Sequence, residues 1–183
     1  TTGAENAAFG SNAASAVTTG QKNTALGAYS LRFDTQGTQS VAVGHQALGA
    51  QNFTSPTAAY NVAVGANAGV SVTTGTNNTF IGGLAGDATT TASNNTAVGY
   101  AALTGNTTAA NNTAVGTSSQ LLTTTGGSNV SVGVQAMRSN TTGQENVGVG
   151  YQALYTNSTG VNNVAMGRRA LYLNTGSSNT ALG

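Results

Sequence analysis

The side chains able to support acid–base, nucleophilic or metal chemistry are few in this chain of 183 residues. The four acidic residues, Glu5, Asp34, Asp87 and Glu145, are far apart in the sequence. No two of them are spaced to form a paired carboxylate site or a metal site with oxygen ligands. The single histidine, His45, follows a glycine of a recurring phrase, so we expect it to be a variable outward side chain. The sequence therefore predicts a non-enzymatic protein without catalytic residues, cofactor or metal.

The composition excludes several further kinds of site. There is no cysteine, which excludes disulfides and thiolate-bound metals. The formal net charge is +1, and the five cations are scattered except for the pair Arg168 and Arg169, unlike a nucleic-acid-binding surface. No apolar run approaches the ~18 residues that a membrane-spanning helix needs. We therefore expect no nucleic-acid partner and no membrane insertion by this segment.

Aromatic and cationic residues gather near the C-terminal end and are the first candidates for ligand contact. They are Tyr151, Tyr155, Arg168, Arg169 and Tyr172. Tyr155 and Tyr172 occupy the same place in successive repeats, which predicts that their rings stack. A stripe of tyrosine and arginine can hold sugars by ring stacking and hydrogen bonds, which indicates a host-cell surface glycan or protein as the partner. Alternatively, the same side chains pack outward to shield a thin core, and both interpretations stay open.

These residues are positioned by a repeat that runs through the whole chain. Its mark is the phrase Asn-x-Ala-x-Gly, in which only Ser40 departs from the asparagine. The closing glycines recur at a nearly constant interval, at Gly10, Gly27, Gly44, Gly65, Gly82, Gly99, Gly116, Gly133, Gly150, Gly167 and Gly183. This periodicity predicts a single array of about eleven stacked coils over residues 1–183, each burying its apolar side against its neighbours.

The residues within one repeat indicate short β-strands joined by tight turns. In residues 95–99 the period is two, so that Thr96 and Val98 face one side and Ala97 the other. We expect a second strand around the following Ala-Leu pair, and turns at Thr-Thr-Gly in which glycine supplies a positive φ. The predicted fold class is all-β, a parallel β-roll or β-solenoid with 17-residue coils. Stacking should also place the asparagines in a ladder of side-chain amides.

Small residues dominate the repeat. Leu, Ile, Val and Phe together number only 32 of the 183 residues, which is little for the core of an isolated monomer. The alanine found two residues before most of these glycines leaves room for close approach, either by the opposite strand of the same coil or by another subunit. We favour contact with another subunit.

One repeat is longer than the others. Four extra residues separate Gly44 from Gly65, and we expect the insertion within residues 53–60, which contain the only proline. An insertion in a stacked repeat normally loops out on one face. It is either a tolerated surface bulge or a contact loop for a receptor, in which Phe53 and Tyr60 are the candidate ligand contacts.

The phrases Asn-Thr-Ala-Val-Gly-Tyr-Ala-Ala-Leu at 95–103 and Asn-Val-Ala-Met-Gly-Arg-Arg-Ala-Leu at 163–171 resemble the head repeats of trimeric autotransporter adhesins. They also resemble the repeated shafts of phage tail fibres and related trimeric bacterial fibre proteins. The resemblance implies a left-handed parallel β-roll, a homotrimer about a threefold axis, and an extracellular place on a cell surface or a virion fibre. It also implies that Ala97, Ala114 and Ala165 face the trimer axis. The present repeat is longer than that of adhesin heads, which implies wider coils or longer turns.

The predicted function is a structural or adhesive segment of such a fibre, acting as a rigid shaft or head in attachment to cells or surfaces. The alternative is an ice-binding β-solenoid, because threonines recur at the interval of the repeat and could form ladders. Adjacent threonines such as Thr124 and Thr125 point to opposite faces of a strand, so only one per coil could join a flat array.

Overall fold

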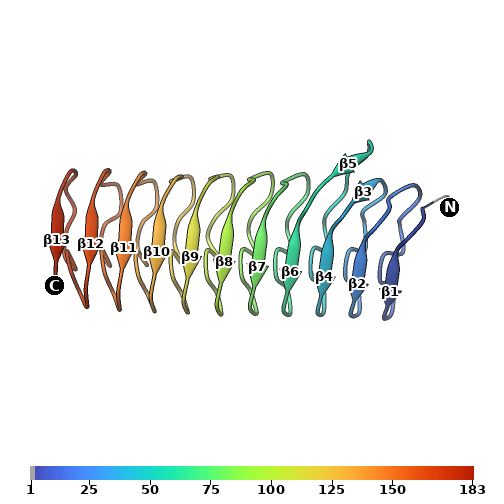
Figure 1. The fold of residues 1–183 in the computed structure, drawn as a ribbon, viewed down its shortest axis with the longest axis horizontal. Coiled ribbons are helices and arrows are strands. Elements are labelled where there is room, and N and C mark those ends of the chain that lie inside the picture. Colours follow the sequence, from blue (N-terminus) through green and yellow to red (C-terminus); the bar gives the residue numbers. More distant parts are fainter. Residues whose placement is uncertain (1–2) are drawn as a thin grey trace.

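The structure, a computed structural model, describes residues 3–183 as a parallel β-solenoid of about ten coils, most of which span one repeat of regular length (Figure 1). The main sheet contains β1 (Ala7–Phe9), β2 (Thr24–Leu26), β4 (Val41–Val43), β6 (Val62–Val64), β7 (Thr79–Ile81), β8 (Thr96–Val98), β9 (Thr113–Val115), β10 (Val130–Val132), β11 (Val147–Val149), β12 (Val164–Met166) and β13 (Thr180–Leu182). β3 (Gly37–Thr38) and β5 (Thr57–Ala58) form a separate pair. Residues 3–183 contain no helix, so the predicted all-β class is confirmed.

Each strand of the main sheet pairs in parallel with the strand one coil away. Ala97 of β8, for example, pairs with Ala114 of β9, its equivalent in the next repeat. The offset along the chain is longer between Ala42 and Ala63, where the coil carries the insertion. Equivalent residues therefore stand in rows along the rod, and we number them from the recurring asparagine (position 1) to position 17.

Alternation along each strand separates buried from outward side chains. The position 3 residues Ala97, Ala114 and Ala165 are fully buried inside their own coils. On the inner side, Ala97 and Ala114 share one core cluster with residues at positions 8 and 9 such as Ala102 and Leu103. The expectation that Ala97, Ala114 and Ala165 contact other subunits is therefore wrong. Because these alanines are small, the opposite wall of the same coil packs closely against them. They have no exposed surface with which to contact another subunit.

A regular coil contains one strand of the main sheet and not the two strands predicted. Around the Ala-Leu pair, Ala101 and Leu103 have φ values of 53° and 56°, in the left-handed region. A backbone that visits this region at alternate residues cannot extend as a strand. Stacking nevertheless continues, because the amide nitrogen of Leu103 donates to the carbonyl oxygen of Ser119 in the next coil at 2.9 Å.

Glycines serve two distinct purposes in the repeat. At position 5, Gly99 has a φ of 132°, and a β-carbon there would lie 2.7 Å from the carbonyl carbon of Gly116. In the Thr-Thr-Gly segments, Gly126 has no positive φ, but a β-carbon would collide with the carbonyl oxygen of Gly143. The expectation that these glycines supply a positive φ is therefore wrong, since what they provide is close approach between coils.

The expected asparagine ladder runs inside the solenoid. The Asn112 Oδ1 accepts a hydrogen bond from the backbone nitrogen of Asn129 at 3.0 Å. The Asn112 Nδ2 donates to the carbonyl oxygen of Gly126, at the far turn of the same coil, at 3.0 Å. The same backbone-to-amide bond links Asn112 to Asn95 and Asn146 to Asn129. Each buried amide therefore joins two coils and fixes the strand to the turn.

Where Ser40 interrupts the ladder, Gln51 completes it. The Gln51 Nε2 donates to the Ser40 Oγ at 3.0 Å, and the Gln51 Oε1 accepts from the Asn61 Nδ2 at 2.9 Å. Asp34, at the position of Gln51 one coil earlier, accepts a second bond from the Gln51 Nε2 at 2.7 Å. A glutamine from the opposite wall thus supplies the amide that a serine lacks.

The insertion projects from one edge of the rod and carries β5, which pairs with β3 of the preceding coil (Figure 1). Tyr60 is 52% exposed at its end, whereas Phe53 is only 6% exposed at its start. Phe53 is therefore wrong as a candidate ligand contact, because its ring is packed inside the coil. Tyr60 stays a prediction.

Candidate functional site

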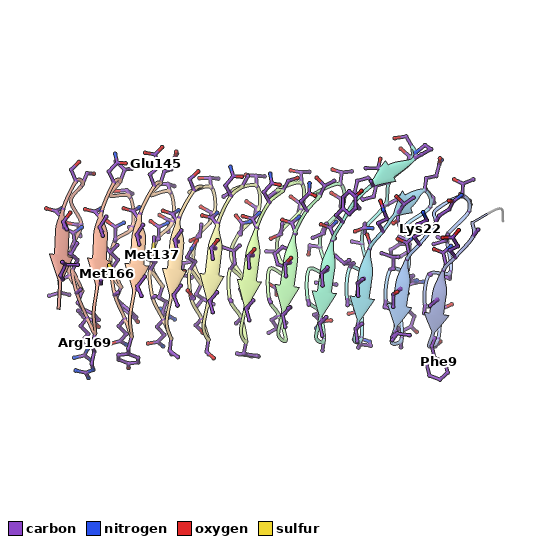
Figure 2. All side chains as sticks on the ribbon, in the orientation of Figure 1. Phe9, Lys22, Met137, Glu145, Met166 and Arg169 are labelled. Atoms are coloured by element: carbon purple, nitrogen blue, oxygen red, sulfur yellow. The ribbon has the colours of Figure 1, made fainter. Side chains whose placement is uncertain are left out.

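The most extensive candidate surface is the outer side of the main sheet, formed by the side chains at positions 2 and 4, which we call the apolar face. Position 4 is apolar in all eleven strands: Phe9, Leu26, Val43, Val64, Ile81, Val98, Val115, Val132, Val149, Met166 and Leu182. Phe9 and Met166, in β1 and β12, lie near the two ends of this row (Figure 2). The row therefore extends along the whole main sheet.

The apolar face is accessible and carries no charged residue. Ile81, Val132 and Met166 are 40%, 38% and 46% exposed. Position 2 holds only alanine, threonine or valine in the strands of the main sheet. Because parallel strands lie about 4.8 Å apart, these side chains form a nearly continuous strip. A contiguous exposed apolar strip of this kind is typical of an interaction surface.

In the sequence, the outward face is marked by the apolar residue at position 4 and not by the alanine at position 3, which was expected to face another subunit. The alternation of Thr96, Ala97 and Val98 correctly separates two sides of the strand. The small size of alanine predicts that it faces a second subunit, whereas the structure turns alanine inward and leaves the larger valine outside. The informative feature of the sequence is therefore the unbroken apolar position 4.

The second candidate is the C-terminal group of tyrosines and arginines. The rings of Tyr155 and Tyr172 stack with centroids 5.0 Å apart and planes 18° apart, which confirms the stacking predicted from their repeat position. The Arg138 guanidinium lies 5.9 Å from the Tyr155 centroid, and that of Arg169 lies 5.2 Å from the Tyr172 centroid. Neighbours within the chain therefore cover much of both half-buried rings.

A side-chain row at position 7 holds Arg169 in place. The Arg169 Nε donates to the Gln152 Oε1 at 3.0 Å, and the Gln152 Nε2 donates to the Gln135 Oε1 at 2.8 Å. Arg169 lies on the edge of the rod that the chain reaches after each strand of the main sheet, and Glu145 lies on the opposite edge (Figure 2). At position 6 the Arg168 guanidinium lies 5.7 Å from the ring of Tyr151, which is 42% exposed. Tyr151 and Arg168 are therefore the more accessible pair for a ligand.

The remaining titratable side chains do not assemble into one centre. His45 is exposed and meets the ring of Tyr29 edge-on, with centroids 6.0 Å apart. Asp34 is buried, and its Oδ1 accepts from the backbone nitrogens of Gly37 and Phe53 at 3.0 Å each. Within residues 3–183 no group of three or more His, Cys, Asp or Glu side chains is arranged to hold a metal ion.

Burial raises the pKa of Asp87 above its usual range, an effect that hydrogen bonds from the backbone partly oppose. Its Oδ1 is buried without a hydrogen-bond partner among the described residues. A buried carboxylate oxygen without a partner disfavours the charged form. Asp87 therefore lowers the stability of the fold when it is ionised.

Comparisons with protein-family models, with curated proteins and with solved structures give no match. In the part of the chain that the structure describes, no helix has the length and apolar character that crossing a membrane requires.

Proposed function

We propose that this chain is a non-enzymatic segment of an extracellular homotrimeric fibre, acting as a rigid shaft or head in attachment to cells or surfaces. The observation that carries the proposal is the apolar position 4, which is unbroken through eleven strands and faces outward. Hydrogen bonds between coils make the rod stiff, and the apolar face gives it a side to pack on. Both properties are needed by a fibre shaft.

Other copies of the same chain are the partners best matched to the apolar face. A partner must present apolar groups at the same spacing of about 4.8 Å per coil, and another copy does so necessarily. The absence of charge at positions 2 and 4 allows like faces to meet without repulsion. The small number of bulky apolar residues, 32 of 183, supports a core that is completed by neighbouring chains.

The number of copies and the winding are the parts of the proposal that rest on the resemblance. The repeats resemble those of trimeric adhesin heads and phage tail-fibre shafts, which implies three left-handed rolls packed about a threefold axis. In this arrangement the residues at the axis are those of the apolar face, Val98 and Val115 among them, and not the alanines between them.

Ice binding is supported less well by the arrangement of threonines. On the apolar face, threonine occupies position 2 in three successive strands, at Thr79, Thr96 and Thr113, and valine replaces it in the next three. In the turns, the Thr124 hydroxyl donates to the carbonyl oxygen of Thr141 at 3.2 Å, so it is engaged by the protein. A regular two-dimensional array of hydroxyls is therefore interrupted. Thermal hysteresis with shaped ice crystals would favour ice binding over the fibre.

The proposal is tested by placing charge on the apolar face. Val115→Glu combined with Val132→Glu should convert the trimer to monomers in sedimentation velocity, because burying unpaired carboxylates at an interface is unfavourable. The matched control is Thr125→Glu with Thr142→Glu, in the same coils but at exposed turn positions, and it should stay trimeric. Equal sedimentation of both variants and the parent chain would contradict the proposed interface.

A further inference from the structure

A hollow of about 120 Å³ opens on the side of the rod away from the strands, across three consecutive coils near the N-terminal end. It is lined by Tyr29, Arg32, Phe33, Gln46, Gly49, Ala50 and Val70. These residues occupy positions 7, 10 and 11, so none belongs to the apolar face. An apolar cavity of about 150 Å³ admits one benzene ring. The hollow is smaller than that and open to solvent, so it can take one face or edge of a six-membered ring and leaves the rest of the ring in water.

The hollow exists because one coil lacks a side chain where its neighbours have one. Position 10 is Arg32, then Gly49, then Val70 in the three successive coils. Arg32 and Val70 form two walls, and the Gly49 backbone forms the floor between them. No positive φ requires a glycine at this place; a β-carbon would lie 3.1 Å from the Gln46 carbonyl oxygen, so a larger residue there needs a small shift of that neighbour.

A cation held between aromatic rings borders the hollow. The Arg32 guanidinium carbon lies 5.2 Å from the Tyr29 ring centroid and 4.6 Å from that of Phe33. Contacts of this kind orient a guanidinium while its N–H groups stay able to bind an anion. The nearest acid in the sequence, Asp34, is buried and accepts hydrogen bonds from Gly37, Gln51 and Phe53. Arg32 is therefore an oriented cation whose charge a ligand can meet.

We propose that this hollow binds a carboxylate-bearing sugar ring, that is, one hexuronate unit of an acidic polysaccharide. The Arg32 fork matches a carboxylate in a bidentate pair. The ring of Phe33, which is 50% exposed, offers a face for the C–H side of the sugar, and the Gln46 amide offers hydrogen bonds to its hydroxyls. The proposal does not depend on trimer formation, because the hollow and the apolar face share no residue.

The test is titration of the full chain with trigalacturonate, followed by amide chemical shifts in NMR spectra. We expect shifts at Gly49 and Ala50 and a dissociation constant of about 1 mM, the range for one charge pair and one stacked ring. Arg32→Gln should weaken binding at least tenfold. Gly49→Val, which places the residue found at position 10 of the next coil, should fill the hollow and abolish binding without unfolding the chain.

The control is Lys22→Gln. Lys22 is an exposed cation that belongs to neither candidate ligand site and does not line the hollow. This variant should bind trigalacturonate like the parent, and neutral maltotriose should not bind to any of them. Absence of trigalacturonate binding, or binding unchanged by Arg32→Gln, would overturn the site. Tighter binding of benzoate than of galacturonate would overturn its assignment to a sugar. Sedimentation of the same variants reports separately on the fibre proposal.

Discussion

The ring of Phe80 lies directly over the α-carbon of Gly86, where a β-carbon would be 2.5 Å from the Phe80 Cε1. Phe80 is at position 3, which is alanine in most coils, and Gly86 is at position 9, which is often leucine, as at Leu103. The volume added on one wall of the coil is thus removed from the other. The interior tolerates sequence variation where such pairs compensate.

The pair Phe80 and Gly86 predicts strong coupling in core stability. Phe80→Ala should lower the free energy of unfolding by about 3–5 kcal/mol, because it leaves a cavity in a close-packed interior. Gly86→Leu alone should also destabilise the chain, since the leucine would collide with the ring. Together they restore the Ala and Leu arrangement of Ala97 and Leu103, so the double variant should be more stable than Phe80→Ala.

These stabilities can be measured by urea unfolding at one fixed protein concentration, because association contributes to the apparent value. Losses that simply add in the double variant would contradict compensation between the two positions.

The asparagine ladder predicts a loss at Asn112 that a residue from the opposite wall can partly restore. Asn112→Ser removes the acceptor used by the backbone of Asn129 and the donor to Gly126, at a cost of about 2–4 kcal/mol. Adding Thr123→Gln reproduces the spacing of Ser40 and Gln51 and should recover part of the loss. Thermal melts of the two variants check this, with Thr108→Ala, an exposed turn position, as the control. No recovery would mean that Gln51 acts only together with Asp34.

Asp87 predicts a pH-dependent effect on stability. Burial raises its pKa, so the folded chain holds the proton more tightly than the unfolded chain does. The stability that the protonated Asp87 contributes is therefore complete below the ordinary Asp pKa of about 3.9. It is lost as pH rises through the raised pKa of the folded state. Asp87→Asn should raise the melting temperature at pH 7, and the gain should shrink toward pH 3. Glu145→Gln, at an exposed acid, is the control, and a gain independent of pH would argue against this cause.

The C-terminal aromatic group predicts different outcomes for its members. Tyr155→Ala and Tyr172→Ala should lower the melting temperature, because both rings pack against each other and against arginines. Tyr151→Ala should leave it nearly unchanged, since that ring is largely exposed. If the group contacts a glycan, binding on a glycan array should fall for Tyr151→Ala and Arg168→Ala. Loss of binding in the tyrosine-stack variants alone would place the contact on the stack instead.

The repeat was sufficient to predict the solenoid, because each residue type recurs at the same position of the repeat and stacked coils place equivalent positions next to each other. The Asn112 ladder and the Tyr155–Tyr172 stack follow from that register alone. The second strand could not be excluded from sequence, because neither Ala101 nor Leu103 is a residue type that marks the left-handed φ values found there.

The candidate sites were harder to predict than the fold. Which residue faces inward depends on what stands on the opposite wall: alanine lies opposite Leu103 and its equivalents, whereas the larger Phe80 is buried where that wall has Gly86. The hollow beside Arg32 exists because Gly49 has no side chain between those of the two neighbouring coils. The sequence does not reveal it, because the three residues become neighbours only when the coils stack.

The proposed fibre depends on packing of the apolar face against copies of this chain. Its most direct test is the mass of the unmodified chain in solution, measured by equilibrium sedimentation over a wide concentration range. A homotrimer has three times the mass of one chain, and we expect this mass to be stable on dilution. A folded, soluble monomer at all concentrations, with the apolar face open to water, would contradict it.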